Sequence, residues 1–79
     1  MDYEVLVPPT ADGAQEVTIR RWLAETGQAV KKGQDLVEAT TQKIALYVPV
    51  PADGVVAEIR AGVGSLVSVG QVIGIVRST

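Results

Sequence analysis

Short apolar stretches alternate along the chain with clusters of glycine, proline and polar residues. Within the stretches, apolar and polar positions tend to alternate, as around Val17 and Ile19, and valine is abundant. This pattern predicts β-strands, because alternation with a period of two places one face of a strand in the core and β-branched residues suit a pleated sheet. The expected strands are Tyr3–Val7, Glu16–Arg20, Leu36–Thr40, a strand from Ile44 or Ala45 to Val48, Val55–Arg60 and Gln71–Val76.

Proline and glycine mark the ends of these strands. Prolines follow the first and the fourth strand, where no ladder donor is needed. Two similar tripeptides, Ala11-Asp12-Gly13 and Ala52-Asp53-Gly54, are expected to form turns of one type. The segment Gly27–Gly33 is predicted to be a turn-rich connector. A short helix over Arg20–Glu25 is an alternative, but it has no good N-cap and Gly27 ends it, so strand and loop are favoured.

A pattern of five residues occurs twice, 37 positions apart. Its first copy is Gly27, Val30, Gly33, Gln34 and Leu36, and its second copy is Gly64, Val67, Gly70, Gln71 and Ile73. Two units are too few for a stacked solenoid, which needs about three or more. We therefore expect two similar β units that close on each other as facing sheets.

Length and composition narrow the functional classes. A chain of 79 residues is expected to form one domain, which buries roughly 60% of its unfolded surface. It contains no cysteine and no histidine, so disulfides, thiol chemistry, the usual zinc sites and histidine-based triads are excluded. The formal charge of −2 and the lack of a basic stripe argue against a nucleic-acid partner. No apolar run approaches the ~18 residues of a membrane span, and no secretory signal opens the chain, so we expect an intracellular domain without a membrane partner.

A single lysine stands near the boundary between the two repeats. The segment Thr41–Ile44 joins two predicted strands and is too short for anything except a tight hairpin turn, with Lys43 at its tip. It contains no glycine or asparagine, so a type I turn is expected rather than a primed one. The position 37 residues after Lys43 lies one past Thr79, so the counterpart of this hairpin is the gap between the chain termini. Lys43 and the termini should lie at opposite ends. A lysine in a turn is, taken alone, usually an ordinary solvated residue.

The residues around this lysine form an ordered set of short motifs. The set consists of Gly27-x-x-Val30-x-x-Gly33-Gln34-x-Leu36-Val37-Glu38, Thr41-Gln42-Lys43, Val48-Pro49, Ala52-x-Gly54-x-Val56 and Gly64-x-x-Val67-x-Val69-Gly70-Gln71-x-Ile73. In this order and spacing, the chain resembles the lipoyl/biotinyl attachment family, and most closely the lipoyl domains of acyltransferase components of 2-oxo acid dehydrogenase complexes. The resemblance implies an all-β fold, a flattened barrel or sandwich of two four-stranded sheets with quasi-twofold symmetry (a barrel-sandwich hybrid). It implies one carrier domain over residues 1–79. Within it, the polar tail of residues 77–79 is expected to be the start of a linker.

The resemblance also implies a function. Lys43 would carry covalently attached lipoate, and Thr41, Gln42 and Ile44 would form the recognition element around it. The domain would be a non-catalytic swinging-arm carrier, part of a dihydrolipoamide acyltransferase, that shuttles acyl groups and reducing equivalents between active sites. The implied partners are a lipoate ligase or lipoyl transferase, a 2-oxo acid decarboxylase, the acyltransferase catalytic domain and dihydrolipoamide dehydrogenase. The implied location is the cytoplasm of a bacterium or archaeon, or the mitochondrial matrix.

Two alternatives to lipoylation remain open on the sequence. Family members usually carry Glu-Thr-Asp-Lys-Ala around the lysine, whereas this chain has Thr40-Thr41-Gln42-Lys43-Ile44. Both acidic positions are neutral, so recognition by the usual decarboxylase does not follow from the resemblance. A biotin carrier shares the fold and the lysine but normally has flanking methionines. An unmodified interaction or scaffold module is the third interpretation.

Other candidate motifs favour structural roles. Gly62-x-Gly64 lacks the third glycine of a dinucleotide fingerprint. Glu38 and Glu58 are expected at solvent-facing strand positions rather than as a catalytic carboxylate pair, and Trp22 is expected to pack rather than to bind a ligand.

Overall fold

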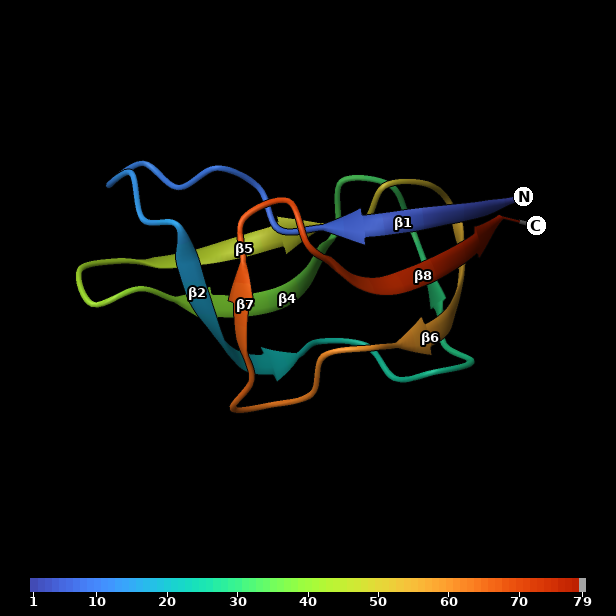
Figure 1. Ribbon diagram of the computed structural model, residues 1–79. Coiled ribbons are helices and arrows are strands. Elements are labelled where there is room, and N and C mark those ends of the chain that lie inside the picture. The colour runs from blue at the N-terminus through green and yellow to red at the C-terminus, as the bar shows by residue number, and fades with distance from the viewer. Residues whose placement is uncertain (79) are drawn as a thin grey trace.

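Eight β-strands make up the computed structural model, which describes residues 1–78 (Figure 1). The strands are β1 Asp2–Leu6, β2 Glu16–Trp22, β3 Ala29–Val30, β4 Asp35–Thr40, β5 Ala45–Pro49, β6 Gly54–Ile59, β7 Leu66–Ser68 and β8 Val72–Ser78. No helix occurs among the described residues, so none of them belongs to a helix that could cross a membrane. The all-β prediction is confirmed.

The strands form two four-stranded antiparallel sheets of matching order. One sheet has the order β1-β8-β6-β3 and the other has the order β5-β4-β2-β7. Exchanging β1 with β5, β2 with β6, β3 with β7 and β4 with β8 converts one order into the other. The predicted pair of sheets with quasi-twofold symmetry is confirmed. The molecule measures 36 × 20 × 17 Å, so the sandwich is elongated.

The repeated glycines occupy equivalent places in the two halves. Gly27 and Gly64 both have a φ of 90°, a left-handed conformation that favours glycine. The N–H of Gly27 donates to the carbonyl of Val56 at 2.7 Å, and the N–H of Gly64 donates to the carbonyl of Ile19 at 2.8 Å. Since each half donates to a strand of the other half, the two units are intertwined.

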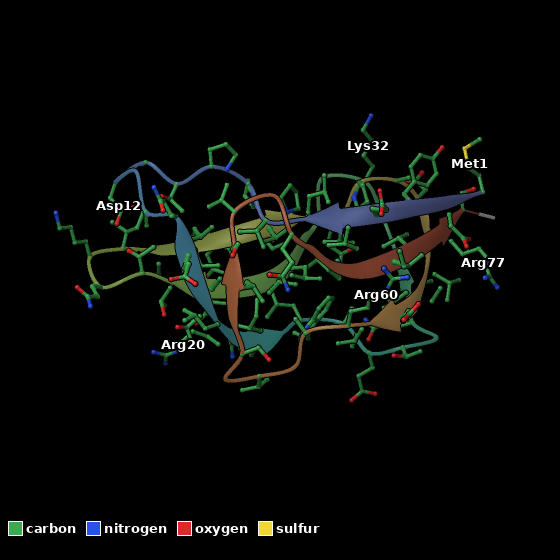
Figure 2. The ribbon with its side chains drawn as sticks, in the orientation of Figure 1. Met1, Asp12, Arg20, Lys32, Arg60 and Arg77 are labelled. Atoms are coloured by element: carbon green, nitrogen blue, oxygen red, sulfur yellow. The ribbon has the colours of Figure 1, made fainter. Side chains whose placement is uncertain are left out.

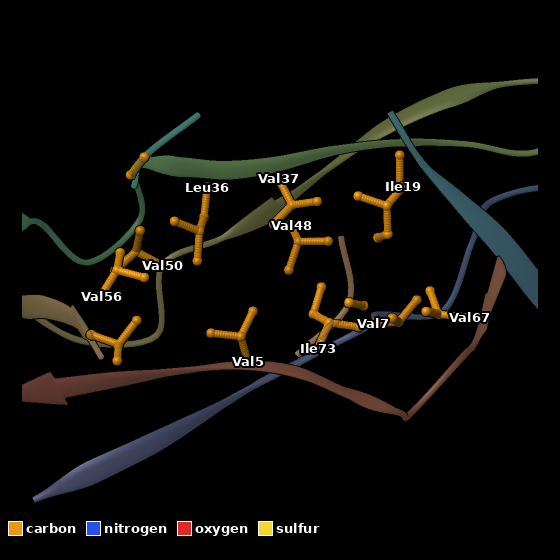
Figure 3. Close-up of a cluster of buried hydrophobic side chains, with 14 of the residues drawn as sticks. Val5, Val7, Ile19, Leu36, Val37, Val48, Val50, Val56, Val67 and Ile73 are labelled. Carbon is orange, nitrogen blue, oxygen red and sulfur yellow. The ribbon is translucent and has the colours of Figure 1, made fainter. Parts of the chain in front are cut away.

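The core lies between the sheets and consists almost entirely of aliphatic side chains (Figure 3). The repeat partners Leu36 and Ile73 are both fully buried. Val17 and Ile19 face inward as predicted, and Val48 is buried with Leu46 packed against the core. The core contains no buried polar or charged residue among residues 1–78, so its stabilisation comes from burial of apolar surface.

Two short strands were not predicted. β3 lies within the expected connector Gly27–Gly33, and β7 lies in the loop before the last strand. With two and three residues, respectively, they are too short to show an alternating pattern. Trp22 ends β2, so the favoured strand for this segment is confirmed over the helix. The Trp22 Nε1–H donates to the carbonyl of Ala61 at 2.7 Å, which confirms a packing role for this residue.

The expected linker at residues 77–79 is wrong for Arg77 and Ser78. Both belong to β8. Arg77 pairs with Asp2 of β1 and with β6, and Ser78 pairs with Gly54 of β6. The Ser78 N–H donates to the carbonyl of Met1 at 2.9 Å, and Arg77 Nε lies 3.0 Å from Asp2 Oδ1. Thr79, the third residue of that prediction, lies outside the described residues.

The two Ala-Asp-Gly tripeptides do not form turns of one type, as had been expected. Gly13 has a φ of 75° and stands in an exposed turn. Gly54 is buried at the start of β6, pairs with Val30 and Ser78, and has no positive φ. A Cβ on Gly54 would collide with the carbonyl oxygen of Arg77. Close approach of two strands, rather than turn geometry, therefore requires the second glycine.

Candidate functional site

The hairpin between β4 and β5 lies at the end of the molecule opposite both termini (Figure 1). Thr40 pairs with Ala45, and the N–H of Thr41 donates to the carbonyl of Ile44 at 2.8 Å. Gln42 and Lys43 are left as the two tip residues. No residue other than glycine has a positive φ in residues 1–78, which excludes a primed turn here, as expected. The predicted separation of Lys43 from the termini is confirmed.

Thr41 organises the backbone of the hairpin turn, the segment Thr41–Ile44. Its Oγ1 accepts hydrogen bonds from the N–H groups of Lys43 and Ile44, each at 3.1 Å. The same hydroxyl donates to Oδ2 of Asp12 at 2.7 Å. A threonine hydroxyl has one proton and two lone pairs, so its whole hydrogen-bonding capacity is used.

Asp12 lies in residues 8–15, the part of the connection between β1 and β2 that we call the 8–15 loop, and this loop packs beside the hairpin turn (Figure 2). Its other carboxylate oxygen, Oδ1, accepts from the N–H of Ala14 at 3.2 Å, and the N–H of Gly13 donates to the carbonyl of Thr10 at 3.2 Å. The hydroxyl of Thr10, and next that of Thr41, hold the pKa of Asp12 below its ordinary value of 3.8. The carboxylate is therefore ionised at neutral pH.

Lys43 presents its amine to solvent. The residue is exposed, and its side chain takes part in no hydrogen bond or ion pair with the residues that the structure describes. Gln42 is also exposed, whereas Thr41 and Ile44 are half-buried. The four residues singled out by the sequence thus lie together on one turn. An accessible primary amine of this kind can form an amide with an activated carboxyl group.

An open groove of about 590 Å³, lined in part by Lys43, runs between the 8–15 loop and the outer face of the sheet β5-β4-β2-β7. Its charged lining residues are Asp12, Glu16 and Lys43. Its lining also includes Thr18, and Leu66 at 64% exposure. This groove could not be predicted from sequence patterns, because its walls come from segments that are distant in the chain.

Glu38 and Glu58 each lie beside arginine side chains. Glu58 is exposed, as predicted, and its Oε1 lies 3.1 Å from Arg60 Nε. Glu38 faces outward but only 18% of its side chain is exposed, since Arg20 and Arg21 lie over it with Nε–Oε distances of 4.0 and 3.2 Å. Within residues 1–78, no group of three or more acidic, histidine or cysteine side chains is placed to hold a metal ion.

The chain is similar to known proteins over nearly its whole length. A family model, Biotin_lipoyl, described as "Biotin-requiring enzyme", matches residues 3–76. The chain is 41% identical over 73 residues to the dihydrolipoyllysine-residue succinyltransferase component of the 2-oxoglutarate dehydrogenase complex of Staphylococcus saprophyticus, covering 92% of this chain and 17% of that protein. It is 36% identical over 76 residues to the dihydrolipoyllysine-residue acetyltransferase component of the pyruvate dehydrogenase complex of Corynebacterium glutamicum, covering 96% and 11%, respectively. The chain therefore spans less than a fifth of the length of these two relatives.

A solved structure is similar over nearly the whole chain. It is the solution structure of the lipoyl domain of the 2-oxoglutarate dehydrogenase complex from Azotobacter vinelandii, with a TM-score of 0.73 and 28% sequence identity. The match covers 96% of this chain and 98% of that domain. The similarity extends to the complete fold of an isolated lipoyl domain.

Proposed function

Since the chain belongs to the biotin/lipoyl attachment family, we propose that it is a lipoyl carrier domain in which Lys43 forms an amide with lipoate. One observation carries this assignment: an exposed lysine stands at the tip of a tight hairpin, at the end of the molecule remote from both termini. The amine fits a covalently attached acyl group, because its side chain has no partner among residues 1–78 that amide formation would disrupt.

The setting of Lys43 differs from that of the other two lysines. Lys31 and Lys32 lie between β3 and β4, and Lys32 lies in the half of the molecule that contains the termini (Figure 2). The backbone N–H of Lys32 is held by Asp53 Oδ1 at 2.7 Å. Neither of these lysines lies on a hairpin tip. In the modification, Nζ of Lys43 forms the new N–C bond, the activating group leaves the carboxyl carbon, and the amine releases its proton to solvent.

The arrangement suits a carrier rather than a catalyst. When bound, the dithiolane of lipoate supplies the redox and acyl-transfer chemistry, while the protein contributes presentation and recognition. The hairpin turn holds the point of attachment, and a tether at the opposite end leaves the attached arm free to visit several sites. Tethering raises the effective concentration of the arm at each site, to the millimolar range for short flexible linkers.

The names of the relatives support a proposal for the partners. Those proteins are acyltransferase components of the 2-oxoglutarate and pyruvate dehydrogenase complexes. We infer that this domain is a non-catalytic part of such an acyltransferase. It would exchange acyl groups with a 2-oxo acid decarboxylase and with the acyltransferase catalytic domain, and electrons with dihydrolipoamide dehydrogenase. A lipoate ligase or lipoyl transferase would modify it. Because the relatives come from bacteria, the proposed location is the bacterial cytoplasm.

The test is the intact mass of the protein produced in cells supplied with lipoate. The expected result is an increment of one lipoyl group that disappears in Lys43→Arg. The matched control is the double variant Lys31→Arg/Lys32→Arg, which should keep the increment. A mass increment of one biotinyl group would instead support a biotin carrier, since biotin is the other cofactor in the family name. No increment in the wild type would overturn the proposal in favour of an unmodified scaffold.

A further inference from the structure

Two N–H groups of the hairpin turn depend on a side chain rather than on the opposite strand. In an ordinary two-residue turn, the fourth residue donates its N–H to the carbonyl of the first. Here the N–H of Ile44 donates to the hydroxyl of Thr41 instead, as does the N–H of Lys43. The Thr41 N–H still closes the turn by donating to the carbonyl of Ile44, but the N–H groups of Lys43 and Ile44 are held only as well as that hydroxyl is fixed.

The hydroxyl is in turn oriented by Asp12. A hydroxyl that accepts two hydrogen bonds can still rotate its proton unless an acceptor holds it. Oδ2 of Asp12 accepts this proton at 2.7 Å, a short distance that is typical of a bond to an ionised carboxylate. Such a bond also polarises the oxygen, which strengthens the two bonds that it accepts.

Asp12 is itself held in place by its own loop. Oδ1 accepts from the N–H of Ala14 at 3.2 Å, and the Thr10 hydroxyl donates to the carbonyl of Ala14 at 3.3 Å. Gly13, with a φ of 75°, allows the chain to fold back at this point. Both carboxylate oxygens are thus engaged, one within the loop and one across 29 residues of sequence to the hairpin turn.

We propose that Asp12 is a positioning residue for Lys43, acting through the Thr41 hydroxyl so that the 8–15 loop and the hairpin turn present the amine as one rigid unit. This inference rests on the proposed function and adds a residue to it. Without the Asp12 bond, the turn samples further conformations, and only a fraction of molecules offers the amine in the geometry that a modifying enzyme accepts. The apparent efficiency of modification falls by that fraction.

The experiment measures initial rates of lipoate attachment to the chain by a lipoate ligase supplied with lipoate and ATP. Asp12→Ala is expected to lower kcat/KM by about tenfold, the factor that corresponds to one lost hydrogen bond of ordinary strength. Thr41→Val removes the hydroxyl and all three of its hydrogen bonds, so its loss should be at least as large. The double variant should be no worse than Thr41→Val, because the Asp12 bond acts only through that hydroxyl. Thr41→Ser keeps the hydroxyl and should retain nearly the full rate.

Asp53→Ala is the matched control. Asp53 also sits in an Ala-Asp-Gly tripeptide and also holds a backbone N–H, that of Lys32 at 2.7 Å, but it lies away from the hairpin turn. Its rate should stay within about twofold of the wild type, as expected for sites without shared partners. Rates of Asp12→Ala equal to those of Asp53→Ala, or multiplicative losses in the double variant, would overturn the proposal.

A second measurement needs no modification at all. Amide hydrogen exchange at Lys43 and Ile44 should be about tenfold faster in Asp12→Ala than in the wild type or in Asp53→Ala, while exchange in the core strands stays unchanged. Unchanged exchange at both amides would overturn the positioning role, whether or not the wild type is lipoylated. Failure of the wild type to accept lipoate would overturn the proposed function alone.

Discussion

Gly54 is expected to be among the least tolerant positions of the chain, because two strands meet at its α-carbon. It begins β6 and pairs with β3 on one side and with β8 on the other. In Gly54→Ala, the new methyl group would overlap the carbonyl oxygen of Arg77 and lie 2.7 Å from its carbonyl carbon and 2.9 Å from the α-carbon of Ser78. All three are backbone atoms, so no change of side-chain rotamer relieves the collision, and β6 and β8 must separate.

The size of the effect follows from the contacts that must give way. Forced overpacking costs about 1–3 kcal/mol, and each ladder hydrogen bond lost nearby about 1 kcal/mol. Together these give a loss of about 2–5 kcal/mol, out of the roughly 4–12 kcal/mol expected for a domain of this size. At about 4–8 °C per kcal/mol, Tm should fall by at least about 8 °C.

The assay is urea unfolding followed by the fluorescence of the single tryptophan, Trp22, which is packed against the core. Gly62→Ala is the control, since a methyl group there meets nothing within 4 Å and Gly62 has no left-handed φ. The control should change the free energy of unfolding by less than about 1 kcal/mol. Equal effects of the two substitutions would refute the reasoning about strand contact.

Three further predictions concern the turn, the tryptophan and acid. Gln42→Asp in the lipoylated domain should raise the rate of reductive acylation by a 2-oxo acid decarboxylase, more at low salt, because it restores an acidic charge beside Lys43; an unchanged rate would count against this role for charge. Trp22→Phe removes the donor to the Ala61 carbonyl, which should lower the free energy of unfolding by about 1–3 kcal/mol in thermal or urea melts, whereas no change would mean that water replaces the bond. The pKa of Asp12 is depressed, so its hydrogen bonds contribute stabilisation above pH 3.8 that is lost as the pH falls through the lower, folded-state value. NMR titration of the Asp12 carboxyl carbon should give a midpoint below 3.8, and a midpoint at or above 3.8 would contradict the assignment of its partners.

Much of the architecture could be predicted because the sequence repeats itself. Gly27 and Gly64 have the same φ, and Leu36 and Ile73 are equally buried. The sequence repeat therefore corresponds to a symmetry of the fold. The same symmetry placed Lys43 opposite the termini. The strands β3 and β7, with only two and three residues, left no such pattern and were missed.

Long-range polar contacts were beyond the reach of sequence patterns. Asp12 and Thr41 are 29 residues apart, and nothing in either local motif indicates that the two side chains meet. The two Ala-Asp-Gly tripeptides also show that a local motif does not determine its structural role. Identical residues serve an exposed turn at Gly13 and a close strand contact at Gly54, because the surroundings of each tripeptide, rather than its letters, decide the conformation.

The most direct test of the carrier assignment is to map the modified residue in protein isolated from lipoate-supplied cells, by fragmentation mass spectrometry of its peptides. The expected result is lipoate on Lys43 alone, with Lys31 and Lys32 unmodified in the same sample. Lipoate on either of those two lysines, or a wild-type Lys43 that stays unmodified in the presence of an active ligase, would contradict the assignment.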